Sequence, residues 1–217
     1  MEGEPRLMKL LLAILVTTLI VIAAFFILFS PGEESRRIVE AEMAGARFVY
    51  ARAYARDETT GAGGLADRLA FVASFPAFTP LTAKQRAAGA PAVMLTVTPK
   101  DDSLDPAERP GKLYARFLTA DALAGPGGLV KRHFEQGSPY DFEELYIAPP
   151  DGRIFFARCP KAHSGAASEA CLSVFRDGAF DVELRFPPVF LENWDALYDG
   201  ARGLLTRMTK AAARKKR

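Results

Sequence analysis

The stretch "CLSVFRDGAFDVELRF", Cys171 to Phe186, decides the fold of this chain. In its second half every other residue is apolar, at Phe180, Val182, Leu184 and Phe186, and charged residues stand between them, at Asp181, Glu183 and Arg185. Because successive side chains of a strand point to opposite faces, this alternation predicts a strand with one buried and one solvated face. Asp177-Gly178, a dipeptide favoured in tight turns, separates this strand from the preceding apolar run. The stretch therefore predicts two antiparallel strands joined by a tight hairpin.

Similar signals precede this hairpin. The segment "ELYIAPPDGRIFFARC", residues 144–159, predicts two further strands around a Pro-Asp-Gly turn. We also predict strands within "ARFVYARAYARD" (46–57), "AVMLTVT" (92–98) and "KLYARFLTA" (112–120). Between them, "TTGAGG" (59–64) is expected to be a turn or loop, and "TAKQRAAG" (82–89) a short helix.

The pattern changes after Pro187-Pro188. Apolar residues then recur at intervals of three and four, at Trp194, Leu197, Tyr198, Ala201, Leu204, Leu205 and Met208. This spacing predicts one amphipathic helix, with Trp194 as an anchor in the core. The expected fold class is α+β: an antiparallel β-meander packed by a C-terminal amphipathic helix.

The N-terminal region predicts a membrane anchor. Residues 10–29 are twenty positions without a charge, a proline or a glycine. As a helix they would rise about 30 Å, the thickness of the hydrocarbon core of a bilayer. A cleaved signal peptide is the alternative, but the run is longer than its usual apolar region and no A-x-A-like cleavage site follows. We therefore predict an uncleaved signal anchor, a single transmembrane helix.

The chain, 217 residues long, has room for this anchor and one domain of ordinary size. We expect a short N-terminal tail (1–9), the transmembrane helix (10–29), a linker helix (30–45), an extracytoplasmic α+β domain (46–208) and a basic tail (209–217). The linker helix is predicted from "SPGE", where Ser30, Pro31 and Glu33 form a capping-box pattern.

The orientation of the anchor does not follow from charge, because basic residues stand on both sides of it. Long domains are translocated largely regardless of nearby charge. The expected location is therefore the bacterial inner membrane, with the N-terminus in the cytoplasm and the C-terminal domain in the periplasm.

The two cysteines, Cys159 and Cys171, leave three alternatives open. In an oxidising compartment they would form a disulfide between neighbouring strands, which is our prediction. With His163 they would offer three zinc-type ligands, but a fourth ligand and a C-x2-C pair are missing from this stretch. His163 beside Ser164 could be written as a base and a nucleophile, although adjacent loop residues seldom reach that geometry.

Two other groups of residues resemble a metal site or an acid–base site. "DDSLD", Asp101 to Asp105, begins like a calcium loop, but Pro106 and Lys112 stand where glycine and glutamate are needed, so a solvated loop is expected. His133 lies near several acids in the sequence, at Glu135, Asp141, Glu143 and Glu144. Their spacing does not place them on one face, so we assign no catalytic residue and no cofactor.

Charge is concentrated at the C-terminus. The net charge is +2, but five basic residues occur in the last eight, so the other 209 residues carry −3. These five are Lys210, Arg214, Lys215, Lys216 and Arg217. An acidic body disfavours nucleic acid as a partner of the folded domain. The tail is either a solvated terminus or a site for an anionic surface, such as phospholipid headgroups or an anionic polymer of the envelope.

These features favour a binding or assembly function. We expect an accessory subunit of a bacterial envelope complex, with the lipid bilayer (through residues 10–29) and another envelope protein as its partners. An envelope hydrolase, with a site assembled from residues far apart in sequence, is the alternative. A third hypothesis places the domain in the cytoplasm, with reduced cysteines.

Overall fold

The computed structural model describes residues 14–19, 35–161 and 169–215. The chain forms two compact units, Met1–Arg37 and Ile38–Arg217. In the first unit, residues 14–19 are helical, and the rest of the predicted span 10–29 lies outside the described residues. Within the described ranges, no helix is both long and apolar enough to cross a membrane.

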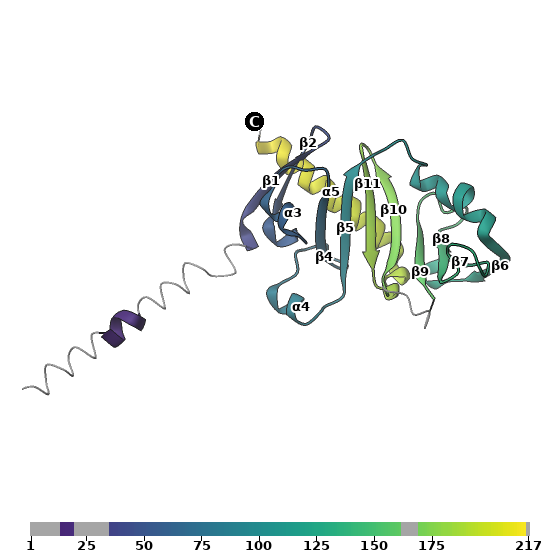
Figure 1. The fold of residues 1–217 in the computed structure, drawn as a ribbon, viewed down its shortest axis with the longest axis horizontal. Coiled ribbons are helices and arrows are strands. Elements are labelled where there is room, and N and C mark those ends of the chain that lie inside the picture. Colours follow the sequence, from purple (N-terminus) through teal and green to yellow (C-terminus); the bar gives the residue numbers. More distant parts are fainter. Residues whose placement is uncertain (1–13, 20–34, 162–168, 216–217) are drawn as a thin grey trace, which may run out of the picture. The chain divides into compact units, whose positions relative to one another are not determined.

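The second unit is built on an eight-stranded antiparallel sheet with the order β4-β5-β11-β10-β9-β8-β7-β6 (Figure 1). The six strands from β6 to β11 follow one another in space as in sequence, so they form the predicted antiparallel meander. The order is completed by β5, which pairs with β11 and carries β4 on its other side. The strands are β4 (Leu69–Ser74), β5 (Ala92–Pro99), β6 (Leu118–Ala124), β7 (Val130–Phe134), β8 (Glu143–Ile147), β9 (Phe156–Pro160), β10 (Cys171–Asp177) and β11 (Phe180–Phe186).

The hairpin of β10 and β11 has the predicted register. Asp177 pairs with Phe180 beside the turn, and Cys171 pairs with Phe186 at the open end. Gly178 in the turn has a φ of 61°, which glycine adopts without steric cost. On β11 the apolar residues Val182 and Leu184 are completely buried, while the charged residues between them stay partly exposed. The two-residue alternation therefore gave the correct buried face.

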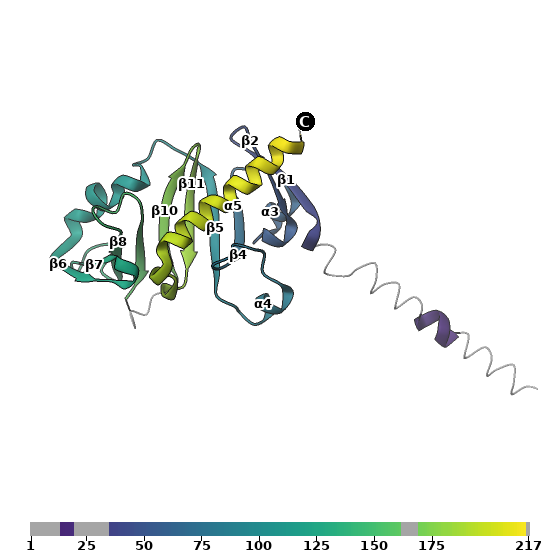
Figure 2. The same cartoon turned by 180° about the vertical axis from the view of Figure 1, so that it is seen from behind.

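The C-terminal helix α5 (Trp194–Lys215) crosses one face of this sheet (Figure 2). Its buried residues are Leu197, Ala201, Leu204, Leu205, Met208 and Ala212. All but Ala212 belong to the same core cluster as buried residues of β4, β5, β10 and β11. The predicted α+β arrangement, an antiparallel sheet with a C-terminal helix packed on it, is confirmed.

A second, three-stranded sheet has the order β2-β1-β3 and corrects the prediction for residues 30–45. Its strands are β1 (Ile38–Met43), β2 (Ala46–Ala51) and β3 (Gly64–Leu65). A linker helix was predicted there, but only residues 35–36 of the described part are helical, and 30–34 lie outside it. Pairing of β1 with β2 buries Val39, Ala41 and Met43 while Glu42 is exposed. The domain therefore begins at Ile38 and not at residue 46.

Four further expectations were wrong in part. The strand predicted over 46–57 ends at Ala51 and is followed by a helical turn, and the loop predicted over 59–64 holds the short helix α3 (Glu58–Ala62). The strand predicted over 112–120 begins only at Leu118, because residues 110–117 are helical and pack Tyr114 into a second core cluster. The tail predicted from 209 is part of α5 up to Lys215.

Short elements complete the unit. The predicted helix near residues 82–89 is α4 (Ala83–Ala87), and Thr82 and Gln85 form its capping box. The remaining helical turns are Arg52–Tyr54, Pro106–Glu108, Pro110–Tyr114, Ala115–Phe117, Pro126–Gly128 and Pro188–Asn193.

A second core cluster forms at the β6 end of the sheet. Its buried members are Tyr114, Phe134, Leu145 and Phe156, and Tyr140 and Val174 pack against it. The strand register places Leu145, Phe156 and Val174 on the face opposite to Cys159, which belongs to the core cluster with α5. The helical segment 110–117 and the loop with Tyr140 thus cover that opposite face at β7–β9.

Candidate binding surface

Beside this second cluster, the same sheet face continues over β5, β11 and β10 with polar and partly exposed side chains. In Figure 1 these three strands are seen with α5 behind them. We define the open face by its side chains, which are Met94, Thr96 and Thr98 on β5, Asp181, Glu183 and Arg185 on β11, and Leu172 and Arg176 on β10. All are partly exposed, and Met94 is 39% exposed. Strand pairing sets them in rows, since Met94, Arg185 and Leu172 are direct neighbours.

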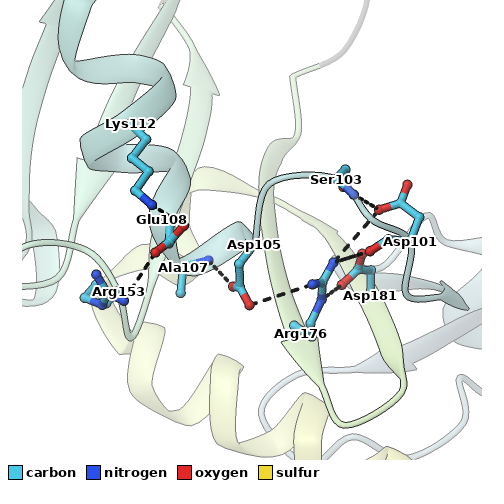
Figure 3. A network of polar contacts seen from close by, with 9 residues as sticks. All are labelled: Asp101, Ser103, Asp105, Ala107, Glu108, Lys112, Arg153, Arg176 and Asp181. Carbon is cyan, nitrogen blue, oxygen red and sulfur yellow. Dashed lines mark hydrogen bonds and ion pairs between the residues drawn. The ribbon is translucent and has the colours of Figure 1, made fainter.

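Arg176 is the centre of a charged network at one end of the open face (Figure 3). Its Nε and Nη2 donate to the two carboxylate oxygens of Asp181, at 2.7 Å and 2.8 Å. Two more carboxylates lie farther out, with Asp101 Oδ1 at 3.9 Å from Nη2 and Asp105 Oδ2 at 3.8 Å from Nη1. The hydrogen bonds to Asp181 raise the pKa of Arg176. This paired geometry is the strong form of an arginine–carboxylate contact.

The network holds the loop that follows β5 against the hairpin. Asp105 Oδ1 accepts a hydrogen bond of 2.9 Å from the backbone N–H of Ala107, and so caps the turn Pro106–Glu108. The backbone N–H of Ser103 donates to Asp101 Oδ1 at 2.9 Å, and hydrogen bonding by Ser103, first through its side chain and then through this N–H, lowers the pKa of Asp101. The segment 101–105, interpreted from sequence as a solvated loop, is thus tied to β10 by Arg176. Across the described residues, no group of three or more His, Cys, Asp or Glu is arranged to hold a metal ion.

A second ion pair stands in the middle of the open face. Arg185 Nε lies 2.8 Å from Glu183 Oε1, two residues apart on the same side of β11. The ion pairs of the open face and its loop involve four carboxylates, at Asp101, Asp105, Asp181 and Glu183, and two guanidinium groups, at Arg176 and Arg185, so these paired groups carry a net charge of −2. Met94 and Leu172 supply apolar area between these charges. This arrangement can bind a positively charged surface.

The solvated face of β11 was predicted from the sequence, but neither the role of Arg176 nor a binding function of this face was. A signal was present, because Arg176 and Asp181 stand one residue outside the pair that closes the hairpin turn. Opposite charges at facing positions of a hairpin form cross-strand pairs. Asp101 and Asp105 lie near Arg176 only because of the path of the loop after β5, and the local sequence pattern does not predict this path.

The acids considered around His133 are only partly brought together. His133 Nδ1 lies 3.6 Å from Glu144 Oε1, on facing positions of β7 and β8. Lys131 Nζ is nearer to the same oxygen, at 2.7 Å, and the Tyr146 hydroxyl donates to Glu144 Oε2 at 3.0 Å. Burial, together with the Glu144 carboxylate, raises the pKa of Tyr146 to about 12.

The other acids near His133 have different surroundings. Glu143 pairs with Arg158 at 2.7 Å, Asp141 accepts from the backbone N–H of Gly137 at 3.1 Å, and Glu135 is exposed. The group on β7 and β8 is therefore Lys131, His133, Glu144 and Tyr146, in which the lysine neutralises the carboxylate.

Cys159 and Cys171 are joined by a disulfide, with their Cα atoms 4.1 Å apart. Cys159 lies on β9 and Cys171 begins β10, and both are buried. His163, the third ligand of the alternative metal site, lies outside the described residues. Because both sulfur atoms are used in the bridge, neither is a thiolate ligand, and the metal alternative is wrong for this structure.

Two other predictions concern α5 and the residues after it. Trp194 packs against the core, stacks on Phe155 with ring centroids 5.2 Å apart, and donates from Nε1 to the Gly127 carbonyl oxygen at 3.0 Å. Of the five basic tail residues, Lys210 is exposed, Arg214 and Lys215 continue the helix, and Lys216 and Arg217 lie outside the described residues.

No protein-family model matches the sequence, and neither does any curated protein. The fold is similar to that of Smlt3025, an immunity protein of the Stenotrophomonas maltophilia type IV secretion system, with a TM-score of 0.58 and 16% identity over 80% of this chain and 93% of that chain. At this identity the likeness is one of fold. The Neisseria meningitidis iron-regulated outer membrane lipoprotein FrpD matches at a TM-score of 0.49 and 9% identity, over 82% of this chain and 94% of that chain.

Proposed function

We propose that this chain is a single-pass, membrane-anchored extracytoplasmic domain that binds a partner protein, as an accessory subunit in the bacterial envelope. The apolar run at residues 10–29 supports the anchor. The bridge between Cys159 and Cys171 supports an oxidising compartment, where disulfides form and persist. The fold shared with an immunity protein supports a binding role, and an immunity role would be one form of it.

The open face is the observation that carries the binding function. Methionine and arginine are enriched in protein interfaces, and this face combines Met94 with Arg176 and Arg185. The ion pairs of both arginines already order their side chains, which lowers the entropy cost of binding. Because carboxylates outnumber guanidinium groups here, the expected partner presents lysine or arginine residues.

Photo-crosslinking in intact cells tests this proposal. With p-benzoylphenylalanine in place of Met94, we expect one defined crosslinked product, because this side chain is 39% exposed on the open face. The same residue in place of Leu65, which is 86% exposed on β3, is the control and should give no such product. Equal products from both positions, or none from position 94, would contradict a specific docking surface.

Variants that remove a charge from the open face test the same proposal through the strength of partner binding. Glu183→Gln removes a carboxylate and should weaken binding of the crosslinked partner by about 5-fold, which corresponds to about 1 kcal/mol. Arg185→Gln removes the opposite charge from the same ion pair and should not weaken binding. Equal losses in both variants would show that the partner needs the ion pair and does not respond to the negative charge.

Thiol labelling tests the location. In intact cells, a membrane-impermeant maleimide should label the chain only after reduction, because Cys159 and Cys171 are bridged and the domain lies outside the cytoplasm. Labelling that requires an opened membrane but no reductant would instead place free thiols in the cytoplasm. That result would contradict both the proposed location and the bridge.

An envelope hydrolase is a second candidate, favoured by His133 facing Glu144 at 3.6 Å. The shorter contact of Glu144 with Lys131 favours a structural ion pair instead. Release of soluble fragments from a dye-labelled cell-wall polymer, lost in His133→Ala and Glu144→Gln, would support the hydrolase.

A further inference from the structure

The end of α5 is an ordered helix and not a loose tail. It continues through Lys215, and Ala212, near its end, is only 5% exposed. The sequence contains no acid after Asp199, but seven basic residues occur in the last eighteen positions. One of these is Arg202, whose Nη2 lies 3.4 Å from Oδ1 of Asp177 on the β10–β11 hairpin. The basic residues from Arg207 to Lys215 are therefore carried on a helical scaffold.

Helical spacing gathers part of this charge on one side of α5. Positions 207, 210 and 214 follow one another at intervals of three and four, so they lie on one face of the helix. The residues that α5 buries, at positions 201, 204, 205, 208 and 212, occupy the opposite face. The side chains of Arg207 and Lys210 are exposed. We call positions 207, 210 and 214 the basic stripe.

The composition around the stripe indicates what it can bind. Between its members stand Met208, which is buried, and Thr209, Ala211, Ala212 and Ala213, which are small. Large apolar side chains that could insert into a hydrophobic groove or between lipid tails are missing from the exposed positions 206, 207, 210, 211 and 213. Attraction by the stripe is therefore electrostatic, and its occupant must be a dense anionic surface.

We propose that the basic stripe of α5 docks on the anionic phospholipid headgroups of a membrane. Phospholipid fits better than nucleic acid, because the 209 residues outside the last eight carry a net charge of −3 and would repel a phosphate backbone that runs along the domain. A planar lipid surface at the end of α5 would also meet the β1–β2 hairpin beside it, where Glu42 and Arg47 lie next to Thr209 and Ala213. Each basic residue near such a surface strengthens binding by about 5-fold. This inference does not depend on the partner of the open face.

Hydrogen exchange of the full chain tests the docking. The protein is incorporated into vesicles of phosphatidylcholine alone, or of an equimolar mixture with phosphatidylglycerol, so that the apolar segment 10–29 meets lipid in both. We expect the amides at the end of α5, residues 209–215, to exchange at least about 5-fold more slowly in the anionic vesicles. Raising the salt concentration should remove this difference. The amides of α4 are the internal reference and should exchange equally in both.

Two double variants with the same change in net charge distinguish an effect of the basic stripe from an effect of total charge. Lys210→Gln/Arg214→Gln should abolish the protection by anionic lipid, whereas Lys84→Gln/Lys100→Gln, with the same change in net charge at exposed positions elsewhere, should retain it. Equal exchange in both kinds of vesicle would overturn the proposal. So would equal protection when short duplex DNA is added to neutral vesicles, because nucleic acid would then be as good a ligand.

Discussion

Replacing both cysteines by alanine, Cys159→Ala/Cys171→Ala, is expected to lower the free energy of unfolding by about 3 kcal/mol. The two residues are 12 positions apart, and the bridge closes this loop in the unfolded chain as well as in the folded one. Without the bridge the unfolded chain gains conformational entropy, which is the main source of the loss. Both side chains are buried, so a small packing loss adds to it.

Urea unfolding of the detergent-solubilised chain measures this effect. The fluorescence of Trp194, the single tryptophan, reports on the core because its ring stacks on Phe155. Reductant should lower the midpoint of the parent protein to near that of the variant and should leave the variant unchanged. A variant that unfolds at the same urea concentration as the oxidised parent would show that the bridge contributes nothing to stability.

The second large effect concerns two glycines of α5 that should respond with opposite signs. Gly200→Ala is expected to destabilise the protein by about 2 kcal/mol, although alanine is the better helix former. A Cβ at Gly200 would overlap Cε2 and Cδ2 of Phe78, and this ring is buried in the core. Gly203→Ala is expected to stabilise the protein by up to about 1 kcal/mol, because a Cβ there would meet only the Arg207 guanidinium group, at 3.5 Å.

The same urea titration compares these two variants. They change the same atoms on the same helix, three residues apart, so helix propensity alone would stabilise both. Changes of opposite sign in the free energy of unfolding would therefore show that α5 closely approaches Phe78 at Gly200. If Gly200→Ala were as stable as Gly203→Ala, the helix would have to lie farther from Phe78 than the structure places it.

Several elements could be predicted because their local pattern and their tertiary surroundings agree. The hairpin of β10 and β11 has one buried face, a tight turn and a strict alternation, so a single register satisfies all three. The apolar spacing of α5 likewise matches the face that the sheet buries. The neighbouring ends of β9 and β10, with a cysteine on each, led to the expected bridge.

Other elements could not be predicted because their partners are distant in sequence. β1 was mistaken for a helix, and its pairing with β2 and β3 is what makes it a strand. The segment 110–117 alternates like a strand, but Tyr114 is buried against Phe134 and Phe156, which are far along the chain. Residues with comparable local propensity for both structures follow the packing that buries more apolar surface.

The candidate sites likewise combine features that could be predicted from the sequence with features that could not. The sequence by itself determined the meander, the C-terminal helix, the paired cysteines and the concentration of positive charge at the C-terminus, because periodicity, turn residues and composition are local properties. Only the tertiary structure decided that Arg176 joins Asp181 to Asp101 and Asp105, and that positions 207, 210 and 214 lie on a helix whose buried residues occupy another face. Such contacts depend on which strands become neighbours and on which helix face is buried, and these choices are made by packing over long distances in the chain.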